Sequence, residues 1–464
     1  MGTPAIDRRF VEETLGPRLR STVGDARPAT GAAFDSRAVQ PGDLFFALPG
    51  EHHDGHAFAL EAASRGASAV VIDRPVDGLE ATGVASYLVE SVLDALQALG
   101  GAWRRQLGDL RVVGITGSVG KTTTRAFTAE LLAPRYRTQA TAGSFNNEIG
   151  VPLTLLQLRP DTERAVIEMG MYTTGEISQL CEWAQPSTGV VLNVGPVHVE
   201  RAGSIEAIVR AKRELIEALP DDGHAILNID DERVASMAPH TRAAITSIGT
   251  ASGATVRASD VVSHGWDGFE FTLSFGGKQS RVHVQLPGAH LVTNTLAAAA
   301  VCLLDGFALD EVAAGLEALR DSPRMRVVAL ANGVTLLDDT YNANPASMAA
   351  ALDLLRGLPG RHVALLGDMR ELGQHATEEH HALGVRAASA VDELYTIGDL
   401  ALEANASART AGLASARHIE GTATATDALR RALRPGDVVL IKGSRALALE
   451  TVVAQLERAI GVAS

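Results

Sequence analysis

Cysteine is scarce in this sequence, which has 464 residues but only Cys181 and Cys302, far apart from each other. Each lies in an apolar or helical context, so we expect buried free thiols rather than catalytic nucleophiles. Two isolated cysteines cannot form a disulfide framework or a CxxC metal site. This scarcity excludes the small disulfide-rich proteins and is typical of a reducing compartment.

Basic charge and long apolar runs are also lacking. The chain carries 41 Lys and Arg against 55 Asp and Glu, a net charge of −14, whereas general nucleic-acid binders usually present a basic face. No apolar run reaches the ~18 residues that span a bilayer, and the first residues, MGTPAIDRRFVEETLG, contain no apolar signal core. We therefore expect a soluble, cytoplasmic protein that binds no nucleic acid and inserts into no membrane.

The hydrophobic content of 46% is enough for real cores, and at ~100–200 residues per domain the length suggests two to four domains. Residues 1–106 mix short strands, such as 44–48 and 69–72, with helices. In residues 107–320, strands alternate with helices, which predicts a mostly parallel sheet. Three further strands, within 255–286 and joined by Gly-rich turns, should pair antiparallel.

The last region, residues 321–464, repeats the alternation with strands at 334–337, 362–366, 393–397 and 438–441. This pattern predicts a second doubly wound unit. The fold class that we expect is therefore α/β with three domains: a small α/β N-terminal domain, a central P-loop ATPase domain with parallel and antiparallel strands, and a C-terminal Rossmann-like domain.

The strongest local signal is a strand at 110–115 that runs into the loop TGSVGKTT, residues 116–123, and then a helix. Such a loop points several backbone N–H groups at one anion. Lys121 adds a charge for the β- and γ-phosphates, and the Thr122 hydroxyl can ligate Mg²⁺. Ile115 stands where the strict GxxxxGK[ST] spacing has glycine, so the match is to a shorter TGxxGKT form. An ordinary turn with a chance GKT is the alternative, and a GTPase or motor would also carry such a loop.

Further polar segments follow along the chain, several of them at predicted strand ends, where α/β sheets place ligands. They are TAGSFNNEIGVP (141–152), IEMG (167–170), NVGPVHVE (193–200), IVRAKRE (208–214), PGAHLVTNTLAA (287–298), SPRMR (322–326), LDDTYNANPASM (337–348), LGDMRELG (366–373) and KGSR (442–445). Taken in this order with the phosphate loop, over essentially the whole chain, they resemble the Mur ligases, which add amino acids to the peptidoglycan precursor.

The resemblance implies ATP and Mg²⁺ as cofactors. Glu168, at the end of an apolar strand, matches a metal ligand of the family, and a carboxylate there can hold Mg²⁺ near the phosphate loop. His198 matches a second ligand, although an isolated His after a proline is usually a surface residue. Lys212 matches a lysine that is commonly carbamylated in this family and helps to hold a second Mg²⁺, and the alternative is an unmodified exposed lysine.

The resemblance also implies nucleotide contacts from two other segments. Asn294 would contact the adenine, because an amide can match both a donor and an acceptor on that ring, although Leu291 stands where the family usually has Asn. An arginine at the start of the third domain reaches the γ-phosphate in this family, and we favour Arg324 over Arg326. Either arginine could instead be a linker charge. Asp339 would contact the nucleotide from the third domain.

The resemblance is closest to the branch of the family that adds D-alanyl-D-alanine to UDP-N-acetylmuramoyl-tripeptide, because of DDTYNANPASM and GDMRELG, and because no DNPR segment is present. Ser36 and Arg37 would then lie near the UDP moiety, unless they merely cap a turn. The predicted roles are catalysis for Lys121, His198, Lys212 and Arg324; metal binding for Thr122, Glu168, His198 and Lys212; nucleotide binding for Thr116, Gly117, Ser118, Val119, Gly120, Lys121, Thr122, Thr123, Asn146, Asn294, Arg324 and Asp339; and substrate contact for Ser36, Arg37 and Asn344.

Three alternatives stay open at this point. Another amide ligase of the superfamily, such as a folate polyglutamylating enzyme, would share the ATP site, although those enzymes lack a uridine-type first domain. A P-loop regulatory ATPase would hydrolyse ATP without regard to amino-acid substrates. An inactive relative would act as a scaffold, which the presence of Lys121, Glu168, His198 and Lys212 argues against. We expect a monomer.

Overall fold

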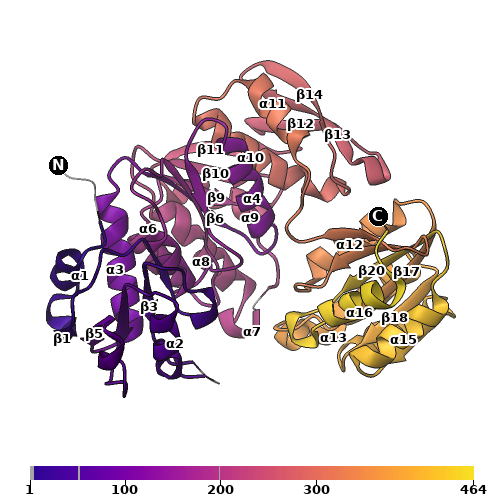
Figure 1. Ribbon diagram of the computed structural model, residues 1–464. Coiled ribbons are helices and arrows are strands. Elements are labelled where there is room, and N and C mark those ends of the chain that lie inside the picture. Colours follow the sequence, from indigo (N-terminus) through magenta and orange to yellow (C-terminus); the bar gives the residue numbers. More distant parts are fainter. Residues whose placement is uncertain (1–4, 51–52, 198, 464) are drawn as a thin grey trace.

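The computed structural model describes residues 5–50, 53–197 and 199–463, and it contains three sheets, each covered by helices (Figure 1). The first sheet has the strand order β1-β5-β4-β3-β2, with only β1 antiparallel to its neighbour. Its elements are α1 (Arg8–Leu15), β1 (Leu19–Val23), β2 (Gly31–Ala33), β3 (Asp43–Phe46), α2 (Ala59–Ser64), β4 (Ala69–Ile72), β5 (Ala85–Val89) and α3 (Val92–Gln106).

Successive residues of these strands point to opposite faces, so one strand serves two cores. Phe46 and Val71 pack with α1 and α3 on one face, whereas Phe45 and Val70 pack with α2 on the other. Both faces of the strands are buried, which explains why the sequence reads as continuous apolar runs.

Helix α3 joins the first sheet to the central one. Trp103 Nε1 donates to the carbonyl of Leu158 at 2.9 Å. Arg104 is buried, and its guanidinium donates to the carbonyls of Ala184 at 3.0 Å and Leu110 at 3.1 Å. The apolar core beneath the first sheet continues through α3 into the central region without a break. The first two regions are therefore packed as one body.

The central sheet has nine strands in the order β14-β13-β12-β11-β10-β9-β6-β8-β7. Strands β6 to β12 pair in parallel with one another. Strands β12, β13 and β14 form an antiparallel extension of this sheet. The strands are β6 (Arg111–Thr116), β7 (Thr138–Ala140), β8 (Arg164–Glu168), β9 (Thr188–Val191), β10 (His224–Asn228), β11 (Ala244–Gly249), β12 (Val256–Ser263), β13 (Phe269–Phe275) and β14 (Lys278–Val284).

Two groups of helices cover the central sheet. Helices α4 (Lys121–Leu132), α10 (Val292–Leu304) and α11 (Leu309–Ala318) share one core with it. On the other face lie α5 (Gly150–Leu156), α6 (Glu176–Ala184) and α8 (Ile205–Glu217), with the short helices α7 (Val199–Ala202) and α9 (Glu232–Ala235) nearby. The parallel strands all end at one edge, next to the start of α4, and this edge positions the site.

The third sheet has six strands in the order β15-β16-β20-β17-β18-β19, and only β15 runs antiparallel to its neighbour. The strands are β15 (Arg326–Ala329), β16 (Thr335–Asp339), β17 (Arg361–Gly367), β18 (Glu393–Ile397), β19 (Ala416–Ile419) and β20 (Asp437–Lys442). Helices α12 (Pro345–Arg356), α13 (Ala376–Ala388) and α14 (Ala401–Thr410) cover one face, and α15 (Thr422–Ala432) and α16 (Glu450–Ile460) cover the other.

The third region touches the central one at separate points. Trp266, in a turn between β12 and β13, is partly buried against the core of the third region. At another point the backbone N–H of Glu200 in α7 lies 3.5 Å from the carbonyl of Glu371. Figure 1 shows the third region as a separate lobe beside the other two. This lobe is therefore joined to the rest through small patches rather than through a shared core.

The predicted fold class is confirmed: three α/β units, the central one with parallel strands followed by antiparallel ones. The boundaries at 106/107 and 320/321 stay a prediction. Both cysteines are free and buried as expected, and burial raises the pKa of each thiol to about 12. In the part of the chain that the structure describes, no helix has the length and apolar character needed to cross a membrane.

Candidate active site

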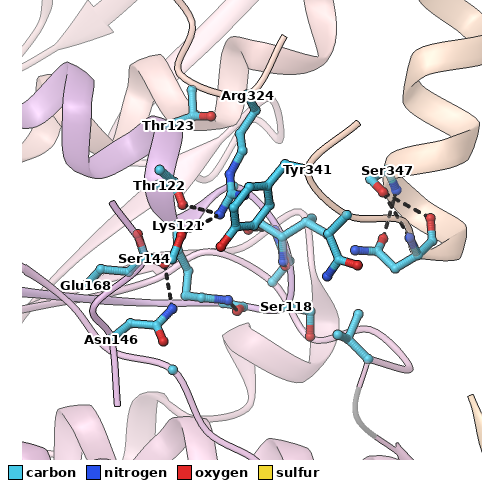
Figure 2. Close-up of a pocket in the computed structure, with 18 of the residues that line it drawn as sticks. Ser118, Lys121, Thr122, Thr123, Ser144, Asn146, Glu168, Arg324, Tyr341 and Ser347 are labelled. Atoms are coloured by element: carbon cyan, nitrogen blue, oxygen red, sulfur yellow. Dashed lines mark hydrogen bonds between the residues drawn. The ribbon is translucent and has the colours of Figure 1, made fainter. Parts of the chain in front are cut away.

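A cavity of about 680 Å³ lies where the three regions meet, at the ends of β6 and β8. The first region contributes Phe34 to its wall, and the third contributes Arg324, Asp339 and Tyr341. The central region contributes most of the lining, including the loop 117–123 and the segment 144–150. Figure 2 shows side chains from the central and third regions pointing toward one another across this cavity.

The loop after β6 wraps around the N-terminus of α4. Gly120 has φ of +85°, and a Cβ there would lie 2.5 Å from Asn294 Nδ2, so glycine is required for both conformation and space. Lys121 Nζ donates to the carbonyl of Gly117 at 2.7 Å. Its pKa is lowered by burial, which Glu168 opposes and Arg324 reinforces. The loop therefore has an anion-binding conformation without a ligand, and the Lys121 amine folds back onto the loop's own backbone.

Asn193, just after β9, braces the same loop. Its Oδ1 accepts from the backbone N–H of Val119 at 2.9 Å, and its Nδ2 donates to the carbonyl of Val119 at 3.1 Å. Ser118 Oγ donates to the carbonyl of Gly195 at 3.1 Å and accepts from the N–H of the same residue at 2.9 Å. The loop is therefore held to the neighbouring strand end before any ligand arrives. The sequence motif contained Asn193, but only the fold shows what it contacts.

Glu168, the last residue of β8, has 0% of its surface exposed. Asn146 Nδ2 donates to its Oε1 at 2.8 Å, as Figure 2 shows. Its Oε2 accepts no hydrogen bond within the described residues, and the nearest charge is Arg125 Nε at 3.9 Å. A buried carboxylate oxygen without a donor is costly unless a cation completes it.

These groups fit a magnesium ion. The Thr122 hydroxyl and Glu168 both line the cavity, and oxygen ligands are what Mg²⁺ prefers. No three His, Cys, Asp or Glu side chains converge on one point within residues 5–50, 53–197 and 199–463. Mg²⁺ needs no such cage, because it usually keeps several waters and binds one or two carboxylates with substrate phosphates. His198, the other predicted metal ligand, lies outside the described residues.

Lys212, on α8, lines the same cavity with only 3% of its surface exposed. Its pKa lies well below its usual value because of burial and, second, because of the charge on Lys121. No hydrogen bond or ion pair to its amine is found within the described part of the chain. The prediction that this lysine belongs to the site is consistent with its position, and the alternative of an exposed helix lysine is wrong.

Glu214, two residues after Lys212, has a structural role that was not predicted from the sequence. Its carboxylate accepts from the backbone N–H groups of Gly175 at 2.6 Å and Ser178 at 3.0 Å. These are free donors at the N-terminus of α6, where a carboxylate is stabilised by the helix dipole as well. Glu214 thereby fixes the start of α6, which supplies Glu176 to the cavity wall, and the loop before it, which supplies Tyr172.

The two arginines at the start of the third region have different places. Arg324 Nη2 donates to Thr122 Oγ1 at 2.5 Å, and its guanidinium lies 3.6 Å from the centre of the Tyr341 ring. Figure 2 shows this arm reaching from the third region to the start of α4. Arg326 lies in β15 instead, where it pairs with Asp338 at 3.0 Å and Glu457 at 2.8 Å. The geometry places Arg324 in the site and Arg326 outside it.

Asp339 ends β16 and pairs with Lys442, which ends β20. Their side chains approach to 2.6 Å, and Lys442 Nζ also donates to the carbonyl of Asn342 at 2.8 Å. Burial raises the pKa of Asp339, and Lys442 and Arg324 oppose that rise. Both members of the pair line the cavity. Lys442 opens the KGSR segment, but the sequence predicts no individual role for it.

Two predicted ligand contacts have structural partners already. Asn294 Nδ2 donates to the carbonyl of Gly120 at 3.0 Å and to Thr124 Oγ1 at 2.9 Å, so its donors brace the phosphate loop. Asn344 caps α12, because its Oδ1 accepts from the N–H of Ser347 at 2.9 Å. Both still line the cavity. Their contacts with adenine and with substrate stay predictions.

The remaining predicted residues fall into two groups. Thr123 lines the cavity, whereas Thr116 is fully buried at the end of β6. Ser36 is buried and donates to Glu61 Oε2 at 2.8 Å, and Arg37 is exposed and pairs with Asp35 at 2.6 Å. Neither Ser36 nor Arg37 belongs to the lining of the central cavity. They lie close in sequence to Phe34, which does line the cavity. The Phe34 ring packs edge-on against the Phe145 ring, with the ring centres 5.8 Å apart.

Comparison with known families places each region of the chain. Residues 115–302 match the Mur ligase middle domain, residues 323–445 match the glutamate ligase domain of the Mur ligases, and residues 29–104 match the Mur ligase family catalytic domain. The UDP-N-acetylmuramoyl-tripeptide–D-alanyl-D-alanine ligase of Mycobacterium tuberculosis is 40% identical over 92% of both chains. The ligase of the same name from Escherichia coli is 37% identical over 91% of this chain and 92% of its own.

Solved structures agree with this placement. MurF from Acinetobacter baumannii superposes with a TM-score of 0.85 at 29% identity, covering 99% of this chain and 100% of its own. MurF ligase from Thermotoga maritima, solved in complex with ADP, gives a TM-score of 0.77 at 30% identity and covers 93% and 98% of the two chains. The likeness therefore spans all three regions together.

Proposed function

This chain belongs to the Mur ligase family, and we propose that it uses ATP to join D-alanyl-D-alanine to UDP-N-acetylmuramoyl-tripeptide. The observation that carries the proposal is the composite cavity, in which a phosphate loop, a buried carboxylate with a free oxygen and an arginine from another domain converge. The reaction is an amide ligation of peptidoglycan precursor synthesis. The enzyme works as a cytoplasmic monomer and needs no nucleic acid.

In the first step, a carboxylate oxygen of the tripeptide attacks the γ-phosphorus of ATP, and the bond to the β-phosphate oxygen breaks. The products are an acyl phosphate and ADP. Phosphoryl transfer requires positioning and charge stabilisation rather than covalent help from the protein. Lys121 and Arg324 supply positive charge from two domains, and the free backbone N–H groups in the first turn of α4 point at the phosphates. Asp339 contacts the nucleotide from the third domain.

In the second step, the amine of D-alanyl-D-alanine attacks the acyl carbon. The tetrahedral intermediate loses phosphate, the amine loses a proton, and the amide remains. An acyl phosphate hydrolyses in water, so the site has to be shielded while it exists. The third lobe supplies this shield, because Arg324 and Tyr341 stand across the cavity from the phosphate loop.

Mg²⁺ supplies charge neutralisation at the transferring phosphoryl group. Glu168, Thr122, His198 and carbamylated Lys212 would hold the ions. The case for the modification of Lys212 is physical: its lowered pKa leaves more of the amine neutral, and a neutral amine can add to CO₂, releasing a proton and leaving a carbamate. That product is an anion, which suits a metal ligand beside the positive charge of Lys121.

The first domain holds the UDP-sugar end of the substrate near Ser36 and Arg37. Phe34 links that region to the cavity wall, so a substrate that begins at the first domain can extend its peptide toward Lys121. Asn344 helps to position the incoming substrate from the third domain. The division of labour explains why residues from all three regions line one cavity.

The test is phosphate release from ATP and Mg²⁺ with UDP-N-acetylmuramoyl-tripeptide, with and without D-alanyl-D-alanine, followed by the mass of the product. We expect release to need both substrates and the product to gain one dipeptide. Release that needs the UDP-sugar peptide together with a different amino acid would move the chain to another branch of the family. Release that ignores both substrates would favour a nucleotide-driven regulatory ATPase.

A further inference from the structure

Arg125 is a buried cation to which neither the sequence motifs nor the proposed reaction assigns a role. It lies on α4 four residues after Lys121, so it faces the same side of the helix one turn on. Only 10% of its side chain is exposed, yet no hydrogen bond from its guanidinium is found within the described residues. Buried guanidinium groups normally satisfy several of their five donors. The buried Arg125 guanidinium is therefore not held by the hydrogen bonds that usually stabilise such a group.

The partner that it faces is the free oxygen of Glu168. Asn146 occupies Oε1 of that carboxylate, and Oε2 is left open with Arg125 Nε at 3.9 Å. This distance is an ion pair but is too long for a hydrogen bond. The oxygen of the proposed magnesium ligand that accepts no hydrogen bond within the described residues therefore has a positive charge just beyond hydrogen-bond distance.

A purely structural pair in the same domain looks different. Arg164 and Asp305 are about as buried, and Arg164 Nε approaches Asp305 Oδ2 to 2.6 Å. A second nitrogen of that guanidinium also bonds to the carboxylate, at 3.1 Å. Buried Arg–carboxylate pairs normally close in this way, because direct hydrogen bonds offset part of the cost of desolvation. The pair at Glu168 is held open instead.

We propose that Arg125 is a positioning residue that sets the affinity of the site for a divalent cation. Its charge balances Glu168 while the site holds no metal, and it opposes a cation at Oε2. A metal then binds tightly only when it arrives with the negative charge of the nucleotide phosphates. The proposal rests on the role of Glu168 given above, and it makes Arg125 the reason why metal and ATP bind together.

The experiment measures Mn²⁺ binding to the full-length protein by electron paramagnetic resonance, with and without a non-hydrolysable ATP analogue. The wild type should bind Mn²⁺ weakly alone and tightly with the analogue. In Arg125→Gln, nucleotide-free Mn²⁺ affinity should rise at least about tenfold, because even at a dielectric constant of ~80 a unit charge about 6 Å from a divalent ion changes its binding by that factor. The increase in Mn²⁺ affinity that the ATP analogue causes should become smaller by the same factor.

Arg135→Gln is the matched control, because it removes an exposed cation from the same domain, where it pairs with Glu311. It should leave both Mn²⁺ affinities unchanged. Arg125→Lys keeps the charge and should keep the dependence on nucleotide, and it also serves if Arg125→Gln fails to fold. Loss of the nucleotide dependence in a folded Arg125→Lys protein would overturn the proposal.

A folded Arg125→Gln protein whose nucleotide-free Mn²⁺ affinity is unchanged or weaker would also overturn it, while leaving the metal site itself intact. A wild type that binds no Mn²⁺ even with the analogue is a separate result. It would refute the metal role of Glu168 in the proposed function, and with it the premise of the inference.

Discussion

Replacing Lys442 with methionine should destabilise the third domain strongly and in a pH-dependent way. The lysine has 2% of its side chain exposed, and its amine lies 2.6 Å from Asp339 Oδ2 and 2.8 Å from the carbonyl of Asn342. Methionine keeps the unbranched apolar stem but removes the charge and the donors. The carboxylate and the carbonyl then stay buried with no cation between them.

The expected loss in the free energy of unfolding follows from the burial of the Lys442–Asp339 pair. Removing one partner of a buried ion pair costs about 3–5 kcal/mol, because the other charge is left uncompensated. For a domain of this size such a loss lowers the unfolding midpoint by roughly 6–20 °C. An exposed pair would cost no more than about 1 kcal/mol, so the two cases are well separated.

The pH dependence has a definite sign. Burial already raises the pKa of Asp339 in the folded protein, and Lys442 opposes that rise. Without Lys442, the folded-state pKa rises further above the unfolded value of about 3.9. A carboxyl whose folded pKa is raised destabilises the fold while it is ionised, fully above the raised pKa, and the cost fades as pH falls toward the unfolded pKa. The deficit of the variant should therefore be larger near pH 8 than near pH 5.

The assay is calorimetric unfolding of the full-length wild type and variant at those two pH values. The double variant Asp339→Asn with Lys442→Met removes both charges and should recover most of the lost stability, since no unpaired charge remains. A loss under about 1 kcal/mol near pH 8 would refute the reasoning. A loss of equal size at both pH values would refute the part that depends on ionisation.

Three further variants test other contacts. Lys121→Ala should lower phosphate release by about 10²–10³, as loss of one charge-stabilising group typically does, with calorimetric binding of the UDP-sugar peptide unchanged. Arg104→Met should lower the unfolding midpoint of the first and central regions together, because its donors tie α3 to α6; two separate transitions would contradict a shared body. Glu214→Gln leaves one acceptor for two N–H groups, so amide hydrogen exchange at Gly175 or Ser178 should speed up about tenfold or more, equivalent to roughly 1–3 kcal/mol.

The sequence predicts several strands well and misses others, among them the interior strands β5 (Ala85–Val89) and β11 (Ala244–Gly249) and some edge strands. Strands β4 (Ala69–Ile72) and β18 (Glu393–Ile397) lie where their apolar runs predict them. Strand β15 was not predicted, because Arg326–Ala329 is mostly exposed and is held as a strand by pairing with β16. Strands β2 and β7 have only three residues each and also lie at sheet edges. Such strands depend on distant partners, which a local pattern does not contain.

The site residues also divide into those that the local sequence predicts and those that only the fold reveals. The phosphate loop and Glu168 could be placed from local order alone, because the carboxyl ends of parallel strands share one edge. The sequence favours Arg324 over Arg326 by resemblance, but the physical reason needs the fold, because it depends on where β15 begins. The cap made by Asn344 was not predicted, although an Asn followed by Pro345 at the first helical position is an N-terminal signal. The brace from Asn294 to Gly120 needed the fold, because α10 reaches the loop only in three dimensions.

The contact between Arg324 and Thr122 connects domain position with chemistry. Thr122 is the hydroxyl expected to ligate a metal, and here it accepts a hydrogen bond from a guanidinium at 2.5 Å. A divalent ion and a guanidinium repel each other, so both can stay near this hydroxyl only if an anion lies between them. The γ-phosphate of ATP is such an anion. Because Arg324 belongs to a lobe attached through small patches, we expect the phosphate that separates the two charges to help set where that lobe sits, and so to couple ATP binding to the placement of the third domain.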